Sequence, residues 1–254
     1  MFDFLKPSSR NTPPPALSPS LPTALILLDN HAAFAHPSGP ASSRSNPLFE
    51  VNLTSLLAAF RVAREAGLSP SQSPSILPLS SKDKDESNSK NDNENNLEVI
   101  HIFHTSDNPA SPLHPQHPMK LIRPLDFARP LSKDKNNSDD GGGTGTGETV
   151  VWKSLNSKPI GPELEAYLRQ RGFRQLLFAG LTTDHCVSTT VRVAANLGLA
   201  DPGRIIVVAD ATAAWAKGGV NADTVHNVSI ASLEGEFAEI MGTEDVVKAL
   251  RRMK

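Results

Sequence analysis

Short runs of aliphatic and β-branched residues alternate along this chain with longer stretches in which apolar residues recur at helical spacing. Such alternation is typical of βα units around a mostly parallel sheet. Because sheets of this kind bind ligands at the carboxyl ends of their strands, polar residues directly after a strand are the first candidates for a functional site. We expect strands at residues 24–28, 98–104, 149–152, 175–179 and 204–209, and helices at residues 51–66, 162–171, 186–197, 222–240 and 243–253.

The composition fits one domain that acts on a small molecule. The chain has 254 residues, of which 38% are hydrophobic, and this is enough for one sizeable core. Its formal net charge of -2 provides no basic field for nucleic acid or for an anionic membrane surface. The apolar run at residues 23–29 is far shorter than the ~20 residues that a helix needs to cross a bilayer. We therefore expect a small-molecule partner, with no nucleic acid and no membrane.

The first 22 residues are rich in Pro and Ser. They lack the positively charged region followed by an apolar region that marks a secretory signal. We expect them to form a tail, and the domain to occupy residues 23–254. The chain has one cysteine, which excludes an internal disulfide and fits a reducing compartment. These features together predict a cytoplasmic protein.

Two segments, residues 69–96 and 132–147, do not fit the βα pattern. They are dominated by Ser, Asn, Asp, Lys and Gly, and they contain few large apolar residues. Such segments bury too little surface to offset the entropy of ordering, so we predict mobile insertions. A docking or phosphorylation segment is the alternative, which the composition alone does not favour.

The densest functional signal lies between an expected strand and an expected helix, in the segment Gly180-Leu-Thr-Thr-Asp-His-Cys186. A thiol attacks as the thiolate, and a helix N-terminus can lower the thiol pKa from about 8.5 through its dipole and free N–H groups. The same N–H groups can hold an oxyanion. A buried structural cysteine is the alternative, but the polar neighbours at residues 182–185 favour a functional role.

Two further polar residues directly follow expected strands. Asp29 ends the first apolar run, where an apolar environment can raise the pKa of a carboxyl group and make it a proton shuttle. Lys153 follows the strand at residues 149–152 and could stabilise a thiolate or an anionic intermediate. Taken separately, a capping aspartate and a solvated strand end are the alternatives for these two residues.

Together, Asp29, Lys153 and Cys186 resemble the isochorismatase-like cysteine hydrolase superfamily in their order and placement. Its members have an Asp after the first strand, a Lys after a middle strand and a Cys in a Gly-x-x-Thr-x-x-Cys-Val turn. The resemblance covers the chain apart from the tail and the two insertions. It also includes residues 44–47, 156–157, 160–161, 210–211 and 232–238.

The resemblance implies a three-layer α/β/α sandwich with a mostly parallel, doubly wound sheet, and amide hydrolysis through a thioester on Cys186. Asp29 would take the thiol proton, pass it to the leaving group and help to activate water, while Lys153 would orient Asp29 and stabilise the thiolate. A cis peptide common in the family maps to Leu181–Thr182. It would aim the amides of Thr182 and Cys186, as an oxyanion hole, at the substrate oxygen. Relatives are usually oligomeric, so we expect a homo-oligomer.

The chain departs from the family in places that affect substrate choice. Many relatives have Gln two positions after the first Asp, where this chain has His31, and Asn-Ser-Ala-Phe after the Lys, where it has Asn156-Ser-Lys-Pro. The sequence therefore leaves undetermined which residues line the substrate pocket. The residues that we expect to contact the substrate are His31, Phe34, Asn156, Asp184 and His185.

No metal or other cofactor is expected. Nicotinamidases of the superfamily bind a metal in the region after the first helix, where this chain has a polar insertion. His101 and His104 have odd spacing on one expected strand and so face opposite sides. His114 and His117 lie in a Pro-rich loop without a nearby carboxylate. His226, which has apolar neighbours on an expected helix, is predicted to be a packing or interface residue.

Three functions stay open at this stage. The first is cleavage of a C–N bond in a small amide or ureide by covalent cysteine catalysis. The second is isochorismate hydrolysis, a vinyl-ether cleavage in which Asp29 acts as the acid and no cysteine attack is needed. The third is a catalytically silent small-molecule-binding or thiol-sensing protein. Retention of Cys186 favours the first over the second, and the intact set of Asp29, Lys153 and Cys186 argues against the third.

Overall fold

A computed structural model of the chain describes residues 17–18, 21–34, 44–67, 97–132, 147–153 and 160–252. Most of the expected tail (1–22) and of the expected insertions (69–96 and 132–147) lies outside the described residues. The described part contains a sheet, the helices around it and the residues that follow most of the strands.

The described strands form one six-stranded sheet in the order β3-β2-β1-β4-β5-β6. All neighbouring strands in it are parallel. The chain winds outward from β1 to β3 and then returns to the other side of β1 to form β4, so the order reverses at β1. The strands are β1 (Thr23–Leu28), β2 (Leu97–His104), β3 (Thr149–Lys153), β4 (Gln175–Leu181), β5 (Ile205–Ala213) and β6 (Glu239–Met241).

Burial along the strands follows their position in the sheet. β1 and β4 lie at the centre and are buried along their full length, as expected of strands covered by helices on both faces. β3 is an edge strand in which Val150 and Trp152 are exposed, whereas its last residue, Lys153, is buried. The side chain of Lys153, at the carboxyl end of this edge strand, is therefore buried in the protein.

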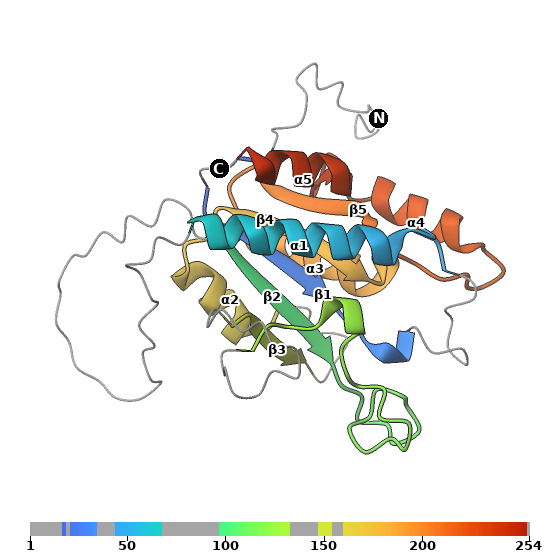
Figure 1. The fold of residues 1–254 in the computed structure, drawn as a ribbon. Coiled ribbons are helices and arrows are strands. Elements are labelled where there is room, and N and C mark those ends of the chain that lie inside the picture. Colours follow the sequence, from blue (N-terminus) through green and yellow to red (C-terminus); the bar gives the residue numbers. More distant parts are fainter. Residues whose placement is uncertain are drawn as a thin grey trace.

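Helices cover both faces of the sheet (Figure 1), which confirms the predicted three-layer α/β/α sandwich. On one face lie α1 (Phe49–Gly67) and α5 (Thr243–Arg251), and on the other lie α2 (Pro162–Gln170) and α3 (Ser188–Asn196). None of the described helices has the length and the apolar content that a membrane span requires. The apolar stripe of α1 consists of Phe49, Leu53, Leu56, Leu57, Phe60 and Ala63.

The helix that we expected at residues 222–240 is wrong in its second half. α4 (Ala222–Ala231) ends early, and the chain then forms the short edge strand β6. Gly235 lies between the two elements with a φ of 74°, a backbone conformation that does not continue a right-handed helix. β6 has three residues, which is too short for a strand periodicity to appear in the sequence.

Gly180 allows the two central strands to meet closely at the carboxyl edge of the sheet. It pairs with Leu28, has a φ of 111°, and a Cβ placed on it would lie 2.2 Å from the carbonyl oxygen of Leu28. The ladder between β4 and β5 shifts its register between Phe178 and Gly180. Position 180, which pairs with Leu28 on the neighbouring strand, therefore requires glycine.

The contact between Gly180 and Leu28 predicts a large cost for a single added methyl group. Gly198 is a matched control, because its φ is also positive, at 59°, but a Cβ on it would meet nothing within 4 Å. We expect Gly198→Ala to lower the free energy of unfolding by about 1–2 kcal/mol, the usual cost of a left-handed alanine. Gly180→Ala should cost at least twice as much, because the backbone must also move. Urea unfolding measures both, and equal losses would contradict the close approach.

Candidate active site

The side chains of Asp29 and Lys153 form a buried ion pair at the carboxyl edge of the sheet. Asp29 directly follows β1, with a φ of 49°, and its amide donates to the carbonyl of Ile102 at 2.8 Å. Lys153 ends β3, two strands away, so its side chain has to span about 10 Å of sheet past the end of β2. Its Nζ lies 3.0 Å from Oδ2 of Asp29.

This pair is almost completely removed from solvent, since 1% of the Asp29 side chain and 7% of the Lys153 side chain are exposed. Removing two charges from water is expensive, and their mutual attraction offsets that cost only while both partners are present. Each charge therefore depends on the other. Burial of a carboxylate and an ammonium group at a strand edge is typical of a functional site rather than of a core.

Cys186 reaches the same ion pair from a turn that follows β4. The turn, η4 (Thr183–Val187), has π-helical geometry and leads directly into α3. The half-buried thiol interacts with the side chains of both Asp29 and Lys153. The structure thus brings together the three residues that the sequence singled out, from the ends of β1, β3 and β4, while their catalytic roles stay predictions.

The protonation of Cys186 differs from our expectation for a helix N-terminus. Burial and the neighbouring negative charge of Asp29 raise the pKa of the thiol to about 12, and Lys153 only partly opposes them. The expected lowering of the thiol pKa by the helix is thus wrong, because burial and the carboxylate are the stronger effects. In the free protein the sulfur carries its proton.

His31 is a buried support beside the ion pair. Its side chain is fully buried, and its Nε2 accepts a hydrogen bond from the backbone amide of His104 at 3.0 Å. Burial lowers the pKa of His31 to about 4, although Asp29 opposes this shift. The ring is therefore neutral with its proton on Nδ1, and its centroid lies 5.1 Å from that of Phe103.

Aromatic rings continue from His31 toward the end of β5. Phe34, in the short helix η1 (Ala32–Phe34), has its ring centroid 6.1 Å from that of His31 and 5.1 Å from that of Trp215. Trp215 lies two residues after β5 and is buried. Phe34 is thus close to the predicted site, whereas Asn156 lies outside the described residues.

The other predicted contact residues, Asp184 and His185, lie on the turn that carries Cys186. The peptide bond between Leu181 and Thr182 is cis, as the family resemblance implied. Asp184 pairs with Lys217, and Nε2 of the largely exposed His185 lies 3.0 Å from the same Lys217 Nζ. Burial works against the charge of Asp184, but the hydrogen bond and the charge of Lys217 hold the pKa of its carboxyl group below the usual value.

Sequence reasoning missed a hydrogen-bond chain that holds the cysteine turn. The hydroxyl of Thr183 lies 2.9 Å from Nδ1 of His226, which is buried on α4. Nε2 of His226 lies 3.4 Å from the amide nitrogen of Asn46, and that nitrogen donates to the carbonyl of Thr212. His226 is thus a packing residue, as predicted, and also a link between α4 and η4. No single motif in the sequence joins these three residues.

The described residues contain no group of three or more His, Cys, Asp or Glu side chains that could hold a metal ion. His101 is instead hydrogen-bonded to Glu148 at 2.8 Å, and Arg61 donates to the same carboxylate. Burial opposes the charge of Glu148, but Arg61 and His101 lower its pKa to about 2. This cluster is an internal ion pair rather than a metal site.

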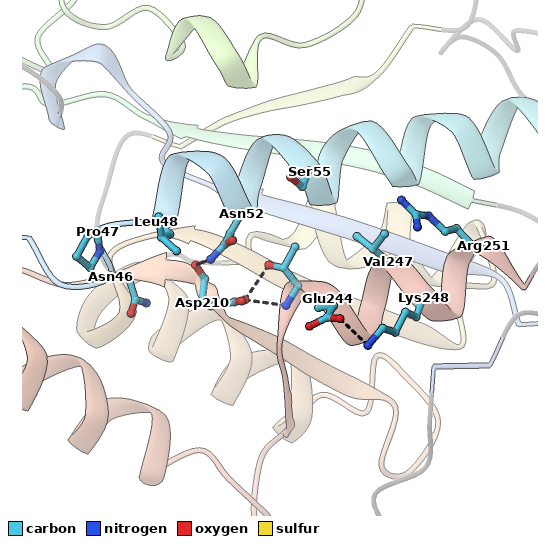
Figure 2. Close-up of a pocket in the computed structure, with 11 residues that line it drawn as sticks. Asn46, Pro47, Leu48, Asn52, Ser55, Asp210, Glu244, Val247, Lys248 and Arg251 are labelled. Atoms are coloured by element: carbon cyan, nitrogen blue, oxygen red, sulfur yellow. Dashed lines mark hydrogen bonds and ion pairs between the residues drawn. The ribbon is translucent and has the colours of Figure 1, made fainter.

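A hollow of about 640 Å³ lies between α1 and α5, with Asp210 of β5 also in its lining, and Figure 2 shows the residues around it. Asp210 caps α5 there, because its Oδ1 accepts from the amide and the hydroxyl of Thr243. Asn52 donates to the Asp210 carbonyl at 3.0 Å. None of the predicted site residues that the structure describes lines this hollow, so we place the candidate active site at the ion pair and not here.

Comparisons with known proteins show a family relationship over most of the chain. The family model of the isochorismatase domain matches residues 23–245. YrdC, an isochorismatase family protein of Bacillus subtilis (strain 168), is 35% identical over 154 residues, which are 59% of this chain and 72% of that protein. A solved structure assigned to the isochorismatase family from Chromobacterium violaceum is 28% identical, with a TM-score of 0.66, and covers 95% of this chain and 99% of its own.

A second solved structure shows likeness of fold. It is a cysteine hydrolase from Pseudomonas syringae pv. phaseolicola 1448A, with a TM-score of 0.64 and 19% identity. The alignment covers 94% of this chain and 96% of that protein.

The electrostatics of the site predict how fast the thiol is alkylated. Because its pKa is about 12, the rate of iodoacetamide labelling of Cys186 should rise about tenfold per pH unit without a plateau up to about pH 10. Asp29→Asn removes a charge that raises the pKa, so labelling at a fixed alkaline pH should become faster. Lys153→Gln removes a charge that lowers the pKa, so labelling should become slower.

Asp126→Asn is the control for these variants, because Asp126 is exposed and pairs only with surface arginines. It should label as the wild type does. Circular dichroism shows whether each variant is folded. A wild-type plateau at or below the ordinary thiol pKa of ~8.5 would disprove the protonated resting state.

Proposed function

The chain belongs to the isochorismatase family of hydrolases, and we propose that it is a cysteine hydrolase that cleaves a C–N bond of a small amide or ureide. The observation that carries this proposal is the Cys186 thiol facing the buried pair of Asp29 and Lys153. A nucleophile, a base and a cation that holds the base are together at a ligand-binding edge.

In the first half of the reaction, Cys186 forms a bond to the carbonyl carbon of the substrate. The thiol proton passes to Asp29 as the sulfur attacks, and the carbonyl electrons move onto the oxygen. The amides of Thr182 and Cys186 are the proposed donors to that oxyanion. Asp29 then gives its proton to the leaving nitrogen, the C–N bond breaks, and a thioester with a released amine or ammonia remains.

In the second half, water cleaves the thioester. Asp29, again a carboxylate, accepts a proton from water as the water oxygen bonds to the carbonyl carbon. The C–S bond then breaks, and the sulfur regains a proton from Asp29, which restores the resting state. Lys153 keeps a cation beside whichever of the two groups carries the negative charge.

The charges near the site support a neutral substrate. Lys153 is paired with Asp29, Lys217 with Asp184, and Arg44 with Glu50. A substrate with carboxylates would have to compete for these cations, whereas an uncharged amide or ureide would not. The pairing thus favours amide chemistry over hydrolysis of the dianionic isochorismate.

Mass spectrometry of the protein with a panel of amides, ureides and isochorismate tests the proposal. We expect an amine or ammonia product, and an acyl adduct on Cys186. Cys186→Ala and Asp29→Asn should each lower turnover by at least about 10³-fold, because both groups take part in the same steps. Asp126→Asn, at the surface, should keep wild-type turnover.

The isochorismate alternative predicts a different pattern. Pyruvate would be released, Asp29→Asn would abolish turnover, and Cys186→Ala would leave it largely intact, because no bond to sulfur forms. Amide turnover that survives in Cys186→Ala would likewise disprove the covalent route.

A further inference from the structure

Buried polar atoms without a hydrogen-bond partner gather at the carboxyl edge of the sheet. Within the described part of the chain, they include side-chain atoms of Asp29, Asn30, Lys153, Asp184 and Trp215. Buried polar groups are nearly always hydrogen-bonded, and each one without a partner requires an explanation. Asp29, Lys153 and Asp184 have an ion-pair partner. Nδ1 of His31 belongs to the same group of atoms, and a backbone contact with Ile122 accounts for it. Asn30 and Trp215 remain unexplained by the reaction chemistry.

Trp215 lies beside the cysteine turn. The sheet register pairs Leu181, the residue before Thr182, with Ala213, so Trp215 follows two residues beyond the partner of Leu181. An antiparallel bridge to Arg44 and ring contact with Phe34 fix its position. A buried indole N–H usually finds an acceptor, but the Nε1 of Trp215 has none among the described residues. It is a fixed donor without an acceptor.

Asn30 provides both kinds of hydrogen-bonding atom. It directly follows Asp29, it is 1% exposed, and neither Oδ1 nor Nδ2 has a partner within the described part. Its backbone carbonyl accepts from Leu125 at 2.8 Å, which holds this segment at the edge of the sheet. An amide side chain pairs best with another amide or a ureido group, because such a group also offers one donor and one acceptor.

We propose that Trp215 and Asn30 recognise the part of the substrate that does not react, and that this part is an uncharged second amide or ureido group. The inference rests on the proposed function and names the substrate class. The indole donates to a carbonyl oxygen of that group, and Asn30 exchanges hydrogen bonds with its amide. A site built to hydrogen-bond a polar group rejects the analogue that lacks it, because its own buried atoms then stay unpaired.

Two amides of nearly equal size test this inference. Malonamide has a second amide group, and 3-methylbutanamide has an isopropyl group of similar shape in its place. The wild type should show a kcat/KM at least tenfold higher for malonamide. Trp215→Phe keeps an aromatic ring but removes the N–H, and Asn30→Leu keeps the volume but removes both polar atoms. Each should remove about tenfold of this preference, mainly through a higher KM for malonamide.

Trp152→Phe is the matched control, because the Trp152 side chain lies half-exposed on the edge strand. It should keep the wild-type preference, and all variants should keep the wild-type profile of Cys186 labelling. A wild type without preference, or variants that lose both activities equally, would overturn the inference while amide hydrolysis stands. Failure to cleave either amide, or turnover by Cys186→Ala, would instead overturn the proposed function and the inference with it.

Discussion

A buried attraction between one carboxylate and one ammonium group determines how the rest of the site is built. Asp29 and Lys153 come from strands that are not neighbours, so their contact requires β2 between them to end at a matching level. The register provides this, because His104 at the end of β2 pairs with Lys153 and Ile102 pairs with Leu28. A pair of this kind adds little net stability, but loss of one partner leaves an unpaired buried charge. Its presence is therefore better explained by chemistry than by folding.

The high pKa of Cys186 is consistent with the same pair. With a carboxylate beside the sulfur, the two groups share one negative charge, and the proton occupies the group that holds the charge less well. Movement of the proton from sulfur to Asp29 leaves the total charge around Lys153 unchanged. The cation can thus stay in place throughout the transfer, and little reorganisation of the surroundings is needed. In the proposed mechanism, the thiolate of Cys186 is then generated only when an acyl group is available to accept its electrons.

How much the sequence could predict depends on where each residue stands relative to its strand. Asp29 and Lys153 directly follow apolar runs, and Cys186 lies in a distinctive turn, so all three were found without coordinates. Trp215 was not, because we expected this strand to end at residue 209, whereas β5 ends four residues later, at Ala213. The extension depends on the register shift opposite Gly180, a property of two strands together. The thiol pKa was misjudged for a similar reason, since it depends on burial and on Asp29, which is remote in the sequence.

The hydrogen-bond chain behind the turn explains why one arrangement of Cys186 is favoured. Asn46 has a φ of 50°, and its amide nitrogen donates to the carbonyl of Thr212, so that nitrogen can offer His226 only a donor. Nε2 of His226 must then carry a lone pair, and its Nδ1–H points to the hydroxyl of Thr183. Burial lowers the pKa of His226, which keeps the ring in this neutral form. Because this series of hydrogen bonds allows one tautomer of His226, the turn that carries Cys186 is fixed by directional bonds as well as by packing. The sulfur of Cys186 is thus held against the buried pair of Asp29 and Lys153.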